Sequence, residues 1–398
     1  MARKNVRRAV IVGCGIAGPV LGMFLRRVGI DGLICEARSR EAQSEGAFLG
    51  VAPNGMNVLA ELGVHAEVEA IGVPCHGFEF RNARGQSIGA IDRRGDASQF
   101  GARLQMVRRA RLHQAFTEAA VARGARVCFG RELVDVDRRD PAAIVARFAD
   151  GSEERGDVLI GCDGIRSLTR QLALPDAPGP AYSGLLDFGG FARCPSAPLE
   201  AGTTVMVFGR RAFLGAFKTP AGEVWWFHNS GEKKPEHVAR DPAATRARIL
   251  ELHRDDPAWI RDVIESTPAL LGPFALHDIL SMPRWHAGRV CLIGDAAHAT
   301  TPSAGQGASM AIEDAMVLAQ CLRDADEPER AFAAFERARR GRVEEIVRQS
   351  RRNGSGKAVS GPVGEWFRDR MLPFFLRLGA RAQHRQYAHR IEWQQPMA

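Results

Sequence analysis

The sequence predicts an α/β fold: a Rossmann-like domain, an inserted domain made mainly of β-strands, and helices at the C-terminus. Three observations lead to this prediction. The chain opens on a βαβ pattern, with an apolar strand at 9–13, a glycine-rich turn, a helix to about Val28 and a second strand at 32–35. Short strands joined by turns dominate about 176–280, and strand and long-helix patterns return after Val290.

The elements of the first domain follow from local patterns. An amphipathic helix begins at Arg109 and stops near Gly124, because apolar residues recur at helical spacing and glycine is a common C-terminal stop. The nearly all-apolar run at 157–162 predicts a buried strand of a parallel sheet. A strand at 290–293 and helices through 312–322 and 328–352 complete this domain.

The inserted domain has a different texture. Alternating residues predict its strands at 203–208, 212–218 and 223–229, and the piece at 73–102 is expected to join the same sheet. Two short helices follow, each opened by an Asp-Pro pair, Asp241-Pro242 and Asp256-Pro257, since Asp is a good cap and Pro suits the first helical position.

These elements divide the chain into three parts. The predicted boundaries are a discontinuous Rossmann-like domain at 1–72, 103–175 and 281–350, an inserted β-sheet domain at 73–102 and 176–280, and a C-terminal helical tail at 351–398. The tail mixes apolar and basic residues around 366–378. It is expected to cover the inserted domain, with contact to a membrane or a dimer partner as the alternatives.

Composition excludes several classes of protein. The net charge is +8, but the basic residues are scattered and no aromatic-interleaved nucleic-acid motif occurs, so no nucleic-acid partner is expected. No run of about 18 apolar residues predicts a membrane span, and the N-terminus lacks the apolar core of a signal peptide. The eight cysteines form no Cys-x-x-Cys pair and no metal-ligand spacing with histidine, so neither zinc nor a disulfide framework is expected. The sequence therefore predicts a cytoplasmic, metal-free protein, as a monomer or a homodimer.

A glycine fingerprint follows the first strand directly. Gly13 permits a tight turn, Gly15 lets the backbone approach a pyrophosphate, and Gly18 lets the helix pack closely on the strand. The amides of Ile16 and Ala17 would face the phosphates at the positive end of that helix. Because a strand precedes the motif and a helix follows it, dinucleotide binding is favoured over a glycine-rich turn that binds nothing.

An acidic residue ends the second strand. Glu36 lies at the spacing expected of the group that accepts hydrogen bonds from a ribose diol. Its charge would repel a 2′-phosphate, so this site suits FAD or NAD. Arg38 is placed near the adenosine, or it is a solvated surface residue.

Two later motifs complete a family resemblance. The chain carries Asp163-Gly164 within 162–167, and Gly294-Asp295-Ala296-Ala297-His298 running on to the loop at 302–307. With the glycine fingerprint, these motifs resemble the group A FAD-dependent monooxygenases, the single-component aromatic hydroxylases of the para-hydroxybenzoate and salicylate hydroxylase kind. The resemblance covers about residues 7–345.

The resemblance implies site residues. Asp295 would bind the FAD ribose, Pro302 would lie against the isoalloxazine ring, and Asp163 would help to hold FAD, with a strand-end turn as its alternative role. Arg109 matches an arginine that contacts the flavin cofactor, although Arg108 is adjacent. The remaining implied contacts come from the loop before a helix N-terminus that faces the flavin N1–C2=O edge, namely Gly305, Gln306 and Gly307. The family often has Asn where this chain has Ser309.

The resemblance also implies the reaction. NADPH or NADH would reduce FAD, O2 would form a C4a-hydroperoxyflavin, and a small aromatic or polycyclic phenol or enol would be hydroxylated. No acid–base pair is demanded, so no catalytic residue is assigned. Substrate contacts are expected from Phe213, Trp226 and His228 of the inserted domain; His228 would be a base or a packed sheet residue. The alternatives are a flavoprotein reductase or saturase and a non-enzymatic nucleotide-binding protein.

Overall fold

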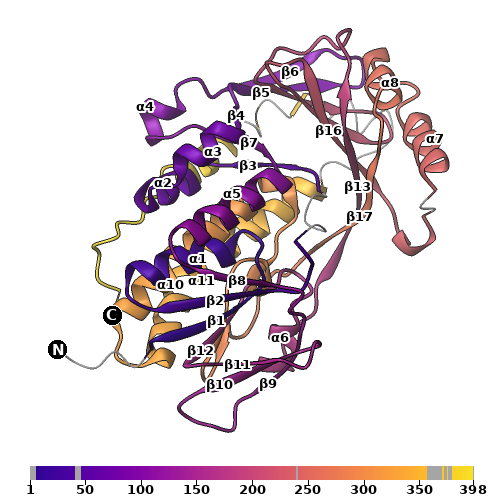
Figure 1. The fold of residues 1–398 in the computed structure, drawn as a ribbon. Helices are drawn as coiled ribbons and strands as arrows, with labels where there is room; N and C mark the ends of the chain where they lie inside the picture. The colour runs from indigo at the N-terminus through magenta and orange to yellow at the C-terminus, as the bar shows by residue number, and fades with distance from the viewer. Residues whose placement is uncertain are drawn as a thin grey trace.

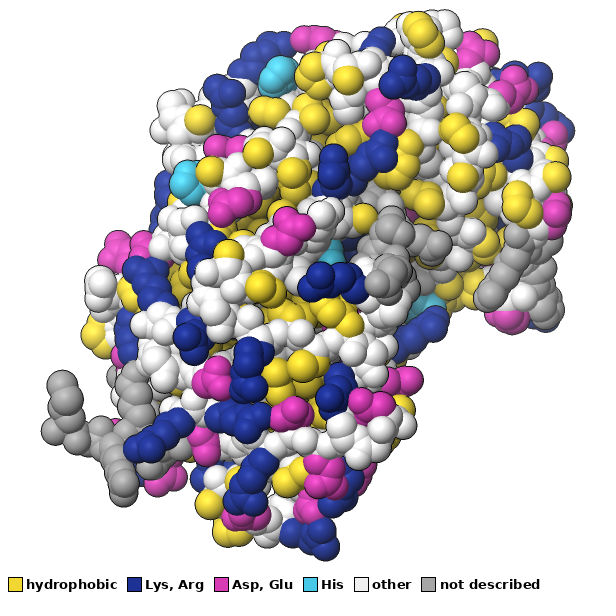
Figure 2. Space-filling view, viewed as in Figure 1, with side chains coloured by type: hydrophobic (Ala, Val, Ile, Leu, Met, Phe, Trp, Pro, Cys, Tyr) yellow, Lys and Arg dark blue, Asp and Glu magenta, His cyan; other side chains and the backbone are white. Residues whose placement is uncertain are grey.

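The computed structural model describes residues 6–40, 46–238, 241–355, 370–371, 374 and 379–397. Figure 1 shows two layered parts, a parallel sheet with its helices below and a larger, mainly antiparallel sheet above. On the face drawn in Figure 2, Lys and Arg side chains are spread among acidic and uncharged ones. Among the described helices, none combines the length and the apolar character that a membrane span requires.

A six-stranded sheet forms the centre of the first part. Its order is β18 (His286–Ala287), β19 (Val290–Leu292), β12 (Val158–Gly161), β1 (Arg8–Val12), β2 (Asp31–Glu36) and β8 (Arg126–Phe129). All neighbours pair in parallel except β18 with β19. The carboxyl ends of β1, β12 and β19 therefore meet at one edge of the sheet, where α/β proteins bind their ligands.

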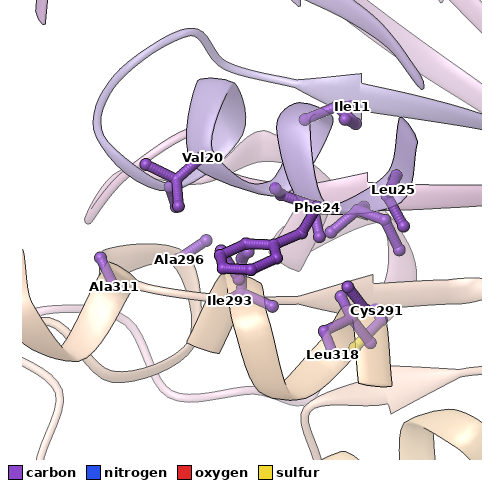
Figure 3. Close-up of a cluster of buried hydrophobic side chains, with 14 of the residues drawn as sticks. Ile11, Val20, Phe24, Leu25, Cys291, Ile293, Ala296, Ala311 and Leu318 are labelled. Atoms are coloured by element: carbon purple, nitrogen blue, oxygen red, sulfur yellow. The ribbon is translucent and has the colours of Figure 1, made fainter. Parts of the chain in front are cut away.

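Helices cover this sheet because their apolar faces need a partner. α1 (Ala17–Arg27), α5 (Arg109–Ala122), α10 (Gly307–Asp324) and α11 (Pro328–Ser355) confirm the expected helices, and α11 continues past 351, where the tail was expected to begin. Figure 3 shows Phe24 of α1 at the centre of a buried cluster that also holds Ile293, beside the sheet, and Leu318 of α10. This contact fixes α1 against α10, the two helices that begin at the edge described above.

A seven-stranded sheet forms the second part. Its order is β17 (Leu271–Asp278), β13 (Ala181–Arg193), β16 (Glu223–Gly231), β15 (Phe213–Lys218), β14 (Thr203–Phe208), β5 (Gly77–Asn82) and β6 (Ser87–Asp92). β5 and β6 show that 77–92, within the piece at 73–102, joins the inserted strands as expected, whereas Val73–Pro74 pairs with a strand of another sheet. The sequence patterns did not predict β13 and β17, the strands at one edge of the sheet.

Two helices pack on one face of this sheet. α7 (Pro242–Leu252) begins as expected, with the Asp241 carboxylate accepting a hydrogen bond from the Ala244 amide at 2.7 Å. α8 (Ala258–Glu265) starts after Pro257, and the Asp256 carboxylate does not cap it. Asp256 instead accepts hydrogen bonds from His253 (2.7 Å) and from the Arg210 amide (3.1 Å).

Smaller elements join the two parts. β3 (Phe48–Val51), β7 (Gln105–Arg108) and β4 (Val73–Pro74) form a short sheet between them, next to α2 (Pro53–Leu62), α3 (His65–Ile71) and α4 (Asp96–Phe100). A separate short sheet of β9 (Leu133–Asp137), β10 (Ile144–Phe148) and β11 (Glu153–Gly156) lies beside α6 (Leu168–Ala173) and the parallel sheet, away from the upper sheet (Figure 1).

The described part of the tail packs on the same chain. Trp393 stacks on Phe24 of α1 with ring centroids 5.3 Å apart, and Tyr387 is buried against Phe100 of α4. The tail thus contacts both parts of the molecule. The mixed apolar and basic stretch at 366–378 lies almost entirely outside the described residues.

Candidate functional site

Three loops converge at the carboxyl edge of the parallel sheet. The loop after β1 lies so close to the loop after β12 that a Cβ atom on Gly13 would be 2.5 Å from the Cys162 carbonyl oxygen. Gly13 also has a φ of +103°, which residues other than glycine rarely adopt. The glycine fingerprint and the Asp163-Gly164 motif are therefore packed against each other.

The glycine loop leads into α1 without a side-chain cap. Ile16 is the N-cap residue and α1 begins at Ala17, with no acidic residue in its first turn. Gly18 packs against the turn, since a Cβ atom there would be 2.1 Å from the Gly13 oxygen, whereas a Cβ atom on Gly15 would meet nothing within 4 Å. The arrangement leaves amides and open space in front of the helix, which suits a diphosphate.

Glu36 lies next to the glycine loop and also anchors it by hydrogen bonds. Its carboxylate accepts hydrogen bonds from the Cys14 amide at 2.7 Å and from the Arg38 amide at 3.0 Å. The Arg38 side chain is exposed. A carboxylate has lone pairs beyond these two bonds, so Glu36 retains capacity to accept from a ribose hydroxyl.

Asp314 of α10 anchors the loop after β19. The Gly294 amide donates to Asp314 at 2.9 Å, and the same carboxylate binds His298 (2.5 Å) and Arg339 (2.7 Å). Burial alone would raise the pKa of Asp314, but the charges of His298 and Arg339 lower it below its usual range. Asp314 is therefore an ionised anchor for the Gly294-Asp295 turn.

Asp295 itself faces open space. Its side chain is exposed, yet the surrounding protein displaces water and raises the pKa of its carboxyl, while His298 and Arg109 oppose that shift. Arg109 thus lies close enough to act on Asp295. Arg108 is engaged elsewhere, in an ion pair with Glu223 at 2.5 Å, and its guanidinium lies 4.0 Å from the Phe191 ring centroid.

The Asp163 carboxylate serves a local turn. It accepts from the Ser167 hydroxyl at 2.6 Å and from the Thr169 amide at 2.9 Å, at the start of α6. Arg170 follows, nearly fully buried, and donates to the Ile165 carbonyl (2.7 Å) and the Ala296 carbonyl (2.9 Å). Arg170 therefore ties the second motif to the third.

The loop at 302–307 leads into the N-terminus of α10. Ser350 of α11 holds the loop, because its hydroxyl donates to the Thr301 carbonyl (2.7 Å) and accepts from the Ala304 amide (3.1 Å). Gln306 is the N-cap residue of α10 but makes no side-chain cap, and its buried Nε2 has no hydrogen-bond partner. Ser309 accepts from the Ala52 amide at 3.0 Å, which anchors α2 to α10.

These features fit FAD. A diphosphate has an uncapped helix N-terminus at α1, a ribose has the carboxylates of Glu36 and Asp295, and a flavin ring has the α10 N-terminus with an unpartnered buried N–H donor at Gln306. Figure 1 shows α1 and α10 side by side beneath the upper sheet. The structure thus brings the predicted cofactor residues to one edge of the parallel sheet.

Comparison with known proteins decides the family. Residues 7–350 match the FAD binding domain family. The chain is 32% identical over 374 residues to the aurachin C monooxygenase/isomerase of Stigmatella aurantiaca, covering 93% of this chain and 94% of the relative. It is 32% identical over 359 residues to the 3-amino-4-hydroxybenzoate 2-monooxygenase of Streptomyces cremeus, covering 88% of each. The chain is a group A FAD-dependent monooxygenase.

Solved structures agree with this assignment. Klebsiella pneumoniae HpxO, crystallised with FAD and uric acid, superposes with a TM-score of 0.87 at 25% identity, covering 96% of both chains. A salicylate hydroxylase substrate complex shares the fold with a TM-score of 0.76 at 21% identity, covering 98% of this chain and 100% of that one. This flavoprotein is therefore an FAD-dependent oxidoreductase with the predicted fold class.

The expected substrate residues of the monooxygenase lie on two different faces. Phe213 shares one face of the upper sheet with Phe208 and Phe227, at ring centroid distances of 5.0 and 6.0 Å. Trp226 and His228 lie on the opposite face, packed beneath α7 and α8. The alternation of side chains along a strand correctly predicts that Trp226 and His228 share a face, but α7 and α8 cover that face. A substrate surface that includes Phe213 therefore does not include Trp226 or His228.

Several residues that hold the site carry no sequence signal of their own. Arg170, Asp314, Arg339 and Asn54 are all buried and polar. Asp314 and Arg339 lie in predicted helices, whereas no element was predicted over Asn54 and Arg170. A buried charge needs a partner from another element, and that partner is unknown until the helices are placed. The adjacent pair Glu313-Asp314 within an otherwise apolar stretch was the one available hint.

Proposed function

We propose that this flavoprotein uses NADPH or NADH and O2 to hydroxylate a small aromatic or polycyclic phenolic or enolic substrate. One observation carries the proposal: an aromatic face of the upper sheet adjoins the loop assigned to the flavin. A Cβ atom on Gly354 of α11 would lie 3.4 Å from Ser303 Oγ and 3.6 Å from Leu185 Cδ1, so the 302–307 loop and β13 both lie against α11 at this point.

The aromatic face is defined by strand register. Asp187 pairs with Asn229, and Asn229 with Phe213, so these residues and those two positions along each strand point the same way. The half-buried or buried members that carry the proposal are Leu185, Asp187, Phe191, Met206, Phe208, Phe213, Phe227 and Asn229. Planar rings pack well against such a surface, and the Asn229–Asp187 hydrogen bond at 2.7 Å supplies a polar element for orientation.

The cofactor, the α10 N-terminus and the aromatic face have separate roles in the proposed reaction. Bound FAD supplies the capacity to accept hydride and to activate O2. The uncapped N-terminus of α10 stabilises negative charge on the ring edge that faces it. The aromatic face holds the substrate ring and keeps water away from it. Relatives support the substrate class, because one is named for a substituted benzoate and another was crystallised with uric acid.

The test follows NADH and NADPH oxidation by the yellow protein against phenols, hydroxybenzoates and polycyclic enols, with labelled O2. The expected result is a compound that stimulates oxidation and yields a product heavier by one labelled oxygen atom. Oxidation without labelling, across every compound that stimulates it, contradicts the proposal and favours a reductase. A matched pair of variants places the substrate: Phe213→Leu on the aromatic face should raise KM, whereas Leu214→Met, on the helix-covered face, should not.

A further inference from the structure

A buried chain of amides runs from the 302–307 loop into the interior. Asn54, the second residue of α2, is 1% exposed, and its Nδ2 donates to Gln306 Oε1 at 3.1 Å and to Glu313 Oε1 at 2.7 Å. Gln306 is also 1% exposed. The chain joins α2, the loop before α10, and a carboxylate within α10.

The carboxylate fixes the direction of this chain. Glu313 is fully buried and is paired with Arg339 (2.7 Å) and Arg342 (2.8 Å). Burial would raise its pKa, but the two guanidinium groups lower it to about 2, so Glu313 is ionised and accepts only. Asn54 must therefore turn its NH2 group toward Glu313.

The same constraint passes to Gln306. The second N–H of the Asn54 amide donates a hydrogen bond to the side-chain carbonyl oxygen of Gln306. The Gln306 NH2 group is consequently directed away from Asn54. The Asn54 Oδ1 atom has no partner, which costs about 1–3 kcal/mol, so the carboxylate sets the amide's orientation in spite of that penalty.

The outcome is a buried donor at the flavin loop. Gln306 Nε2 makes no hydrogen bond in the structure, although buried polar atoms rarely lack one. We infer that Asn54 is a positioning residue, which orients Gln306 so that its N–H donates to an acceptor atom of the flavin ring. This inference rests on FAD binding and not on the identity of the substrate.

Asn54 is not needed to attach α2. Ser309 already binds the Ala52 amide, and a Cβ atom on Gly55 would lie 2.9 Å from Ser309 Cβ, so α2 and α10 are in direct contact beside it. Asn57, one turn further along α2, supplies a matched control, because its Nδ2 donates to the Phe100 carbonyl of α4 at 2.9 Å and not to the 302–307 loop.

The experiment measures the midpoint potential of bound FAD without substrate. A donor to the ring stabilises the reduced, more negative flavin, so Gln306→Met should weaken reduced FAD about 10- to 100-fold relative to oxidised FAD. For a two-electron couple this lowers the potential by about 30–60 mV. Asn54→Leu should lower it similarly, and the double variant should match the single ones. Asn57→Leu should leave it at the wild-type value.

Two results would overturn the inference. One is an Asn54→Leu protein with wild-type potential, and the other is a double variant in which the two shifts add, since Asn54 would then act independently of Gln306. Melting of the apoproteins identifies variants that fail to fold. Gln306→Met covers that case, because it removes the donor directly, so an unchanged potential in this variant also refutes the inference.

Discussion

Gly15→Ala should separate cofactor binding from folding. A Cβ atom at this position meets no protein atom within 4 Å, and Gly15 does not have a positive φ. The alanine should therefore leave apoprotein stability unchanged or raise it by up to about 1 kcal/mol, because it restricts the unfolded chain. The open space beside Gly15 is where a pyrophosphate approaches the backbone. A methyl group there should raise the Kd for FAD by about 10- to 100-fold, or about 1.4–2.7 kcal/mol.

Gly18→Ala is the matched comparison. Its Cβ atom would lie 2.1 Å from the Gly13 oxygen, closer than the 3.0 Å below which real Cβ contacts essentially never occur. α1 must then move by about 1 Å, at a cost of about 1–3 kcal/mol. The assay is thermal melting of both apoproteins, with FAD titration followed by flavin fluorescence. Wild-type FAD affinity in Gly15→Ala, or equal loss of apoprotein stability in both variants, would refute the reasoning.

Three further predictions concern other contacts. Arg170→Met leaves a buried carbonyl (Ala296) and a partly buried one (Ile165) without this donor, so apoprotein unfolding free energy should fall by about 2–4 kcal/mol and FAD should bind more weakly; unchanged FAD affinity would show that the two motif loops keep their places without it. Trp393→Ala removes the stack on Phe24 and should cost about 3–5 kcal/mol in urea denaturation, whereas a change below 1 kcal/mol would mean that the tail is only loosely attached. Burial lowers the pKa of His228 well below 6.5, and the nearby His253 and Arg248 lower it further. The His228 side chain is therefore neutral in the native protein, whereas in the unfolded chain it gains a proton below pH 6.5. Stability should therefore fall as the pH drops below 6.5, and an equally steep slope in His228→Gln, measured by denaturation between pH 5 and 8, would contradict this.

Much of the fold was predictable because its signals are local. The strand–turn–helix pattern around Gly13 and the motifs at Asp163 and Gly294 needed only their neighbours in sequence to be recognised. β13 gave no such signal, since Gly189-Gly190 interrupts the alternation of its side chains. The structure explains the glycines: a Cβ atom on Gly189 would lie 2.6 Å from the Trp226 oxygen, and one on Gly190 would lie 2.5 Å from Thr267.

The candidate site was less predictable where it depends on contacts between distant elements. Alternation places Trp226 and His228 on one face of β16, but only the packing of α7 and α8 reveals which face meets the other domain. Asp256 illustrates the same limit. Its Asp-Pro pattern predicts a cap, yet its carboxylate binds His253, which in turn contacts His228 at 2.8 Å.

α10 connects these observations. Its apolar stripe predicts the helix but leaves out Glu313 and Asp314, which the structure buries between α2 and α11 together with their arginine partners. Replacing a buried ion network with apolar residues is often neutral for stability, so stability alone does not account for these charges. What they determine is position: Asp314 holds the Gly294 amide, and Glu313 orients the amides that lead to the 302–307 loop. Conservative changes in this network should therefore alter the midpoint potential of the bound flavin before they unfold the protein.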